Sequence, residues 1–117
     1  MIVTHHPLPF RPLKRLTSET PEGRILWQLA GAQISVYSPH TAFDSAEEGI
    51  NQQLATGLGL IDVGPLVPNE SGGGAGRVGR LAAPVSLGEL GARVKKLLAI
   101  NQAQAVGPLA GQVERVA

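Results

Sequence analysis

The chain has 117 residues, ten basic against nine acidic side chains, and no cysteine. That length fits one ordinary domain, and a net charge of +1 provides no bulk field to attract nucleic acid or an anionic membrane. The absence of cysteine excludes a disulfide scaffold, a thiolate zinc site, an iron–sulfur cluster and a cysteine nucleophile. Charged residues make up only 16%, against about 25% in a typical soluble domain. We therefore expect another chain, or further parts of this one, to cover some of the surface.

The sequence shows no sign of a membrane or export segment. No apolar run approaches the roughly 20 residues that a membrane helix requires. Residues 1–7 (MIVTHHP) have neither the basic nor the apolar region of a signal peptide, so we expect a soluble, cytoplasmic protein. The β-branched residues 2–4 predict a strand with nothing before it to pair with, which indicates a chain cut from a longer one.

The first third of the chain predicts a strand, a helix and a second strand. The first strand is expected near residues 2–5. Thr20 as N-cap, followed by Pro21 and an acidic residue, predicts a helix over 21–31. Residues 34–37 (ISVY) predict a short buried strand.

The middle of the chain predicts a helix followed by a loop. Ser45 and Glu48 match a capping box, and apolar residues every four positions predict a helix over 46–58 with one buried face. Residues 61–85 are rich in glycine and proline and show no apolar periodicity. We expect an irregular loop there, with its tip at residues 71–75 as the most mobile part.

The last third predicts a helix and further strands. Ser86 and Glu89 form another capping box ahead of a helix expected over 87–100. Residues 103–106 and 112–116 are candidate strands. The alternation of strands and helices along the chain predicts an α/β fold around a mixed or parallel sheet.

The three histidines of the chain each follow a predicted strand. His5 and His6 follow the first strand, and His40 follows the second, four residues before Asp44. Ligands gather at the carboxyl ends of strands in open α/β sheets, and imidazole with carboxylate suits zinc, iron, manganese or cobalt. A metal site is one interpretation. The other is a surface histidine pair and a local hydrogen bond between His40 and Asp44.

Residues 74–79 (GAGRVG) match the G-x-G-x-x-G pattern of dinucleotide-binding loops. No predicted strand leads into the pattern, and Pro84 prevents a helix from starting there, so the context favours a loop that joins two elements. Arg77 in this loop could still contact an anion. The sequence has no Ser-centred nucleophile elbow and no P-loop lysine.

Two segments carry a family resemblance. Residues 2–14 (IVTHHPLPFRPLK) and 36–44 (VYSPHTAFD) resemble the Nif-three-like dinuclear metal-centre proteins, also named GTP cyclohydrolase I type 2 homologues. The similarity continues in order through residues 20–24, 76–79 and 86–90 and so spans nearly the whole chain. The combination of the HHP–F motif, which ends at Phe10, with His-Thr-x-x-Asp is its specific part.

The resemblance implies two divalent metal ions (zinc, iron or manganese) held between two similar halves of the protein, and assembly into a hexameric ring. His5 and His6 match the paired histidine ligands of the family. Asp44 matches its bridging or terminal carboxylate. His40 matches a histidine that lines the site, where it would orient the ligands or shuttle a proton.

The resemblance also implies an internal fragment of the family fold. The family's N-terminal helix and strand have no counterpart here, and its C-terminal H-x-x-x-E ligand pair is missing because no histidine follows His40. We expect one partial domain over 1–117: a metal-ligand half (1–60), the glycine- and proline-rich loop (61–85), and a helix and strand leading into the next half (86–117). The open site predicts weak or no metal binding by this chain and tight binding by a complete one.

Three functions follow from these patterns. The first is a dinuclear metal-dependent hydrolase of the GTP cyclohydrolase type 2 kind, acting on a small-molecule or nucleotide substrate when intact; no guanine-reading motif identifies that substrate. The second is a non-enzymatic, ring-forming metal-binding protein that serves regulation or interaction, which the shortage of charge suits. The third is an inactive truncated fragment that lacks two of its ligands.

Overall fold

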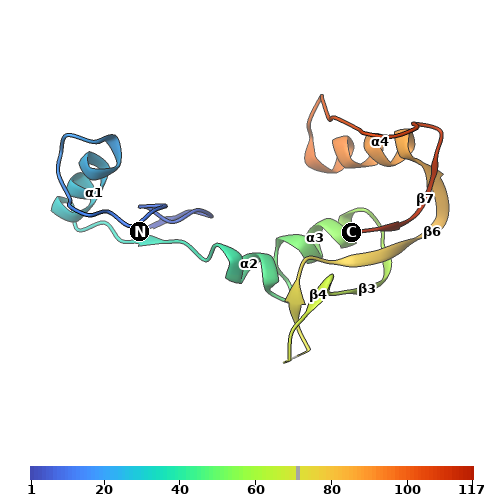
Figure 1. Ribbon diagram of the computed structural model, residues 1–117, viewed down its shortest axis with the longest axis horizontal. Helices are drawn as coiled ribbons and strands as arrows, with labels where there is room; N and C mark the ends of the chain where they lie inside the picture. Colours follow the sequence, from blue (N-terminus) through green and yellow to red (C-terminus); the bar gives the residue numbers. More distant parts are fainter. Residues whose placement is uncertain (71) are drawn as a thin grey trace. The chain divides into compact units, whose positions relative to one another are not determined.

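The computed structural model describes residues 1–70 and 72–117. These residues form two compact units, Met1–Phe43 and Asp44–Ala117. Helices and strands are interspersed along the chain (Figure 1), so the predicted α/β class is confirmed. The strands of the described residues are distributed over three small sheets rather than one. No helix in this part of the chain is both long and apolar enough to cross a membrane.

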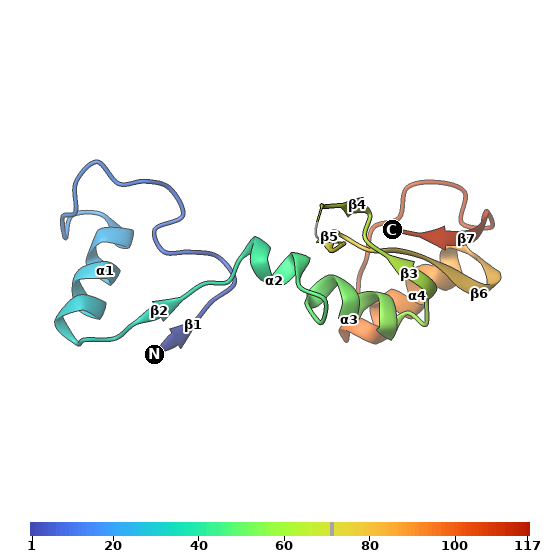
Figure 2. The ribbon, with the colours of Figure 1, turned by 90° about the horizontal axis from the view of Figure 1, so that it is seen from below.

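The first unit consists of two paired strands with one helix between them in the sequence. β1 (Ile2–Val3) pairs in parallel with β2 (Val36–Tyr37), and the two strands lie side by side in Figure 2. Both predicted strands are thus confirmed in shorter form, but the second is not buried as predicted, because its Tyr37 is 58% exposed. Helix α1 (Pro21–Gly31) occupies the predicted range.

The start of α1 is held by its N-cap and by a close backbone approach. Thr20 Oγ1 accepts a hydrogen bond from the Gly23 N–H at 3.2 Å, as the capping pattern predicts. A Cβ on Gly23 would lie 1.9 Å from the Thr17 carbonyl oxygen. Only glycine therefore lets the preceding loop close against the first turn of the helix.

The region predicted as one helix over 46–58 contains one shorter helix, and another helix ends just before it. α2 (Thr41–Ser45) ends at the residue expected to cap the helix, and α3 (Ile50–Gly57) begins later. Its N-cap is Gly49, whose extended backbone separates the two helices and which has no side chain to cap with. The Ser45–Glu48 capping box was therefore a wrong prediction.

Residues 61–85 are not the irregular loop that the composition predicts. They contain β3 (Ile61–Gly64), β4 (Val67–Pro68), β5 (Gly74–Ala75) and β6 (Val78–Ser86). The predicted mobile tip includes residue 71, which lies outside the described residues. β4 and β5 pair as an antiparallel hairpin.

The longest strand, β6, contains a proline yet lies at the centre of a sheet. It pairs antiparallel with β3 on one side and with β7 (Gln112–Val116) on the other (Figure 1). The register with β7 shifts between Arg80 and Val85, so Pro84 falls where the ladder is interrupted and needs no N–H. This irregularity allows the central strand to contain a proline.

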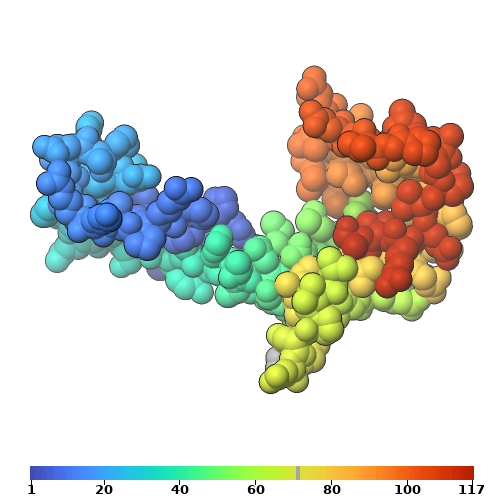
Figure 3. Space-filling view, viewed as in Figure 1, coloured from blue at the N-terminus to red at the C-terminus, as the bar shows by residue number. Residues whose placement is uncertain are grey.

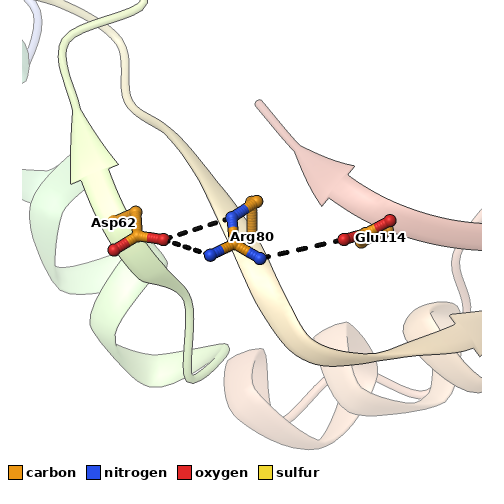
Figure 4. Close-up of polar contacts among 3 residues, drawn as sticks. All are labelled: Asp62, Arg80 and Glu114. Atoms are coloured by element: carbon orange, nitrogen blue, oxygen red, sulfur yellow. Dashed lines mark hydrogen bonds and ion pairs between the residues drawn. The ribbon is translucent and has the colours of Figure 1, made fainter.

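Arg80 links the three strands of this sheet through ion pairs. Its guanidinium binds Asp62 of β3, with Nε 3.1 Å from Oδ2, and Nη1 lies 3.8 Å from Glu114 Oε1 of β7 (Figure 4). All three side chains are about half exposed or more. At that exposure the pairs set cross-strand alignment more than they add stability.

The last helix, α4 (Leu87–Leu98), begins as predicted and ends earlier than residue 100. Ser86 Oγ accepts the Glu89 N–H at 3.1 Å. Ala99 takes a left-handed conformation with φ 53°, which stops the helix. The candidate strand at 103–106 was a wrong prediction: the segment is irregular and Val106 is 99% exposed.

The hydrophobic core is small and lies in the second unit. Among the described residues, the buried hydrophobic side chains are Ala55, Leu81 and Val85. In residues 1–43 the one buried residue is Gly23. Figure 3 shows the atoms of this unit in blue to blue-green. The first unit therefore has no apolar core of its own.

Candidate metal centre

The pairing of β1 with β2 brings the three histidines together. His5 and His6 follow β1 and His40 follows β2, and the two strands run in parallel, so both chain segments leave at the same end of the pair. Two backbone hydrogen bonds fix this alignment: Ile2 N–H to Ser35 O at 2.8 Å and Thr4 N–H to Tyr37 O at 3.0 Å.

The histidine cluster (His5, His6 and His40) has the geometry of a potential metal site. Each residue offers a ring nitrogen, and no two of these nitrogens lie farther apart than 4.8 Å. The chain bends at His5 and His6, so their ring centroids are 5.0 Å apart, and that of His40 lies 5.5 and 5.6 Å from them. His5 and His6 are exposed and His40 is half-buried, so solvent reaches the cluster.

A left-handed backbone conformation positions His40. Its φ is 43°, a region that costs a residue with a side chain about 1–2 kcal/mol. The turn also begins α2, because Ala42 N–H donates to Pro39 O and Phe43 N–H donates to His40 O. Strained backbone of this kind is common where a side chain must be held in a required place.

Sequence reasoning included Phe10 in the family motif but did not predict that its ring packs beside the cluster. Phe10 lies edge-on to His6 and His40, with ring centroids 5.5 and 6.1 Å away. It is the one aromatic residue of the proline-rich segment 7–12. This position in a stretch otherwise suited to an exposed loop was the available signal.

The histidine cluster fits a divalent metal ion in its donor set. Neutral imidazole binds zinc, iron, copper and nickel. Two imidazole nitrogens on one tetrahedral zinc lie about 3.3 Å apart, given zinc–nitrogen bonds of ~2.0–2.1 Å. The observed separation, up to 4.8 Å, requires either a closure of up to about 1.5 Å around one ion or a division of the ligands between two.

Asp44 belongs to the other unit and remains a predicted ligand. It lies in α2, four residues beyond His40, and its main-chain carbonyl accepts a hydrogen bond from Asn51 Nδ2 at 2.9 Å. That bond ties α2 to α3. Coordination of a metal by the Asp44 carboxylate stays a prediction.

The glycine-rich segment 74–79 has a structural role, because it runs from β5 into β6 and its arginine bonds to other parts of the protein. Arg77, predicted as an anion contact, donates hydrogen bonds to four protein acceptors: Gln52 Oε1 at 2.9 Å and the carbonyls of Gly74, Gly76 and Ala46 at 3.1, 2.7 and 3.0 Å. The guanidinium therefore fastens the β5 strand to the region of α3. As predicted, the segment joins two elements, although those elements are strands.

The sequence is similar to proteins from yeast and bacteria. The chain is 40% identical over 115 residues to "Protein NIF3 homolog" of Schizosaccharomyces pombe, covering 92% of this chain and 41% of that protein. It is 42% identical over 90 residues to "GTP cyclohydrolase 1 type 2 homolog" of a Nostoc species, covering 77% and 34%. The chain thus spans less than half the length of these curated relatives.

The fold matches that of two solved structures. A Bacillus cereus protein related to NIF3 superposes with a TM-score of 0.84 at 20% identity, over 97% of this chain and 58% of the other. A hypothetical protein from Staphylococcus aureus superposes with the same score and identity, over 97% and 50%. The family model of Duf34/NIF3 (NGG1p interacting factor 3) matches residues 1–117. Taken with the conjunction of the histidine motifs, that full-length match shows that the chain belongs to the Duf34/NIF3 family.

Proposed function

We propose that this chain supplies the histidine cluster to a divalent metal centre, and that the complete protein uses this centre for hydrolysis. The observation that carries the proposal is the convergence of three ring nitrogens within 4.8 Å, from residues 34 positions apart in the sequence. Chance surface histidines have no reason to converge from two strand ends.

The proposed centre holds two divalent ions, with Asp44 as the carboxylate ligand. Two ions about 3.5–4 Å apart would polarise a substrate and lower the pKa of a bound water. His5 and His6, which are exposed residues, would each bind through a ring nitrogen. A ring nitrogen of His40 lies within 4.8 Å of those of His5 and His6, so His40 would serve as a third ligand or accept a proton.

The names of the relatives are the basis of the proposed reaction class. Proteins named "GTP cyclohydrolase 1 type 2 homolog" from three bacteria match this chain, which supports a nucleotide substrate for the complete protein. Because the chain covers 41% or less of these relatives, we assign the activity to the complete protein. A cytoplasmic location stays a prediction.

A second candidate function is a metal-binding assembly without catalysis. The first unit exposes large apolar side chains, with Phe10, Trp27 and Tyr37 at 60, 53 and 58%, and it lacks a buried apolar core. Such a surface supports the predicted homo-oligomeric ring, since an obligate interface resembles a divided core. An experiment on the longer protein distinguishes the two candidate functions. Under the first, His5→Ala abolishes GTP turnover; under the second, chelation and His5→Ala change only assembly.

Zinc titration of this chain tests the metal centre directly. Because its only histidines are the three in question, histidine ring signals in an NMR spectrum report on the cluster alone. We expect all three rings to respond over one range of zinc concentration, even if binding is weak. Each His→Ala variant should raise the zinc concentration required by at least about tenfold, the smallest cost of losing a group that merely supports a ligand.

Gln104→Ala, a change at an exposed residue of the second unit, serves as the control and should leave the titration unchanged. Three rings that respond independently to zinc would refute the metal centre, and so would a longer protein in which none of the three rings responds. For His40, loss of zinc binding in His40→Ala identifies a ligand. Retained zinc with lost turnover in the longer protein identifies a proton acceptor.

A further inference from the structure

We infer that the hydroxyl groups of Thr4 and Ser38 position the histidine cluster, a role that rests on the proposed metal centre. Thr4 immediately precedes His5, and Ser38 lies two residues before His40. The two hydroxyls therefore come from the two chain segments that carry the histidines.

Both hydroxyls converge on the main chain of His6. Thr4 Oγ1 donates to the His6 carbonyl at 2.8 Å, and Ser38 Oγ lies 3.2 Å from the same carbonyl. The two hydroxyl oxygens are 2.6 Å apart. We call this three-way contact the hydroxyl clamp; it joins the end of β1 to the end of β2.

The number of hydroxyl protons shows which of the two hydroxyl groups is central to the hydroxyl clamp. A hydroxyl has one proton to donate, so two hydroxyls can make two full hydrogen bonds among three short contacts. The shortest contacts are Ser38 to Thr4 and Thr4 to the His6 carbonyl. Thr4 is then the central member, accepting from Ser38 and donating to His6, while the 3.2 Å contact is the weaker branch.

The hydroxyl clamp matters because little else aligns the two segments. β1 and β2 are two residues each, and a two-stranded ladder is marginal by itself. Thr4 adds two hydrogen bonds to this ladder: its N–H bonds to Tyr37 O, and its hydroxyl bonds to that of Ser38. It thereby fixes how far His6 stands from His40, which is the distance that a metal ion must bridge.

Four substitutions test this positioning role. Thr4→Val removes the hydroxyl and keeps the β-branched shape, Thr4→Ser keeps the hydroxyl, and Ser38→Ala removes the outer member. Thr56→Val, at an exposed position of α3, is the matched control. Two readouts are needed: zinc titration of the histidine rings, and ring-to-ring NMR cross-relaxation between His6 and His40, whose centroids are 5.6 Å apart.

Thr4→Val should weaken zinc binding about tenfold, as loss of a group that supports a ligand does, and should abolish the His6–His40 cross-relaxation without metal. Ser38→Ala should weaken zinc binding about threefold, the cost of one ordinary hydrogen bond. Thr4→Ser should restore both readouts to within about twofold. Thr56→Val should match the parent chain.

The two readouts separate this inference from the metal proposal. Unchanged zinc binding and cross-relaxation in Thr4→Val would overturn the positioning role while the metal centre stands. Lost cross-relaxation in Thr4→Val, together with no zinc response of the three rings even in the longer protein, would support the hydroxyl clamp and overturn the metal centre. If Thr4→Val unfolds β1, Ser38→Ala decides, because it leaves every backbone hydrogen bond of β1 in place; full zinc affinity in that variant would refute the role.

Discussion

The left-handed backbone of His40 makes a quantitative prediction about two substitutions. His40→Ala and His40→Gly both remove the ring and its contacts, so their difference isolates the backbone. Alanine keeps the strain of a φ near 43°, about 1–2 kcal/mol, whereas glycine avoids it and instead loses about 0.5–1 kcal/mol in backbone entropy. We expect His40→Gly to be the more stable by about 0.5–1 kcal/mol.

Amide hydrogen exchange measures this difference in stability at the pairing of β1 with β2. The Thr4 N–H, bonded to Tyr37 O at 3.0 Å, is exposed to exchange when β1 parts from β2. Its protection should be about two- to fivefold higher in His40→Gly than in His40→Ala, because 1.4 kcal/mol corresponds to a factor of ten. Neither variant should retain zinc binding like that of the parent chain.

A control pair in a helix should show the opposite order. Gln53 is exposed within α3, where glycine is less favourable than alanine by about 1 kcal/mol. Gln53→Gly should therefore lower the protection of the α3 amides relative to Gln53→Ala. Equal or greater protection of Thr4 in His40→Ala would show that the turn carries no strain, and would refute the argument.

Two further substitutions test the second unit. Leu81→Ala should lower the free energy of unfolding by about 2–5 kcal/mol, because Leu81 is 2% exposed and the change leaves a cavity; Leu109→Ala, at 60% exposure, should cost far less in the same urea titration, and equal losses would contradict the assigned core. Ser86→Ala should cost about 1 kcal/mol by removing the N-cap of α4, read as a lower thermal midpoint, with Ser18→Ala as control; identical midpoints would mean that the cap is not formed in solution.

Short-range signals predicted the elements that depend on them. The caps at Thr20 and Ser86 formed because each hydrogen bond joins residues three apart, so the local sequence contains both partners. The same pattern failed at Ser45, where the residue was drawn into α2 and Gly49 interrupted the helix. A local motif predicts a helix start only where the adjoining backbone permits one.

The strands of residues 61–85 escaped prediction because their partners lie elsewhere. β6 (VGRLAAPVS) mixes small residues with two valines, a leucine, an arginine and a proline, and has no regular apolar alternation to mark it. Its hydrogen bonds go to β3 and, across some thirty residues of sequence, to β7. Some of the glycines and prolines that predicted a loop lie within these strands, as Gly64, Pro68 and Gly79 do, and Pro84 lies at the register shift with β7, where a strand tolerates it.

The sequence by itself determined the class of the protein and its family, because the histidine motifs and their order survive without coordinates. It also identified His5, His6 and His40, since all three follow β-branched runs. Only the tertiary structure decided that their ring nitrogens come within 4.8 Å, that Phe10 packs beside them, and that two hydroxyls join their segments. The reason is physical: these contacts depend on the parallel register of β1 and β2, and a register between strands more than thirty residues apart is set by packing and turn geometry rather than by either strand alone.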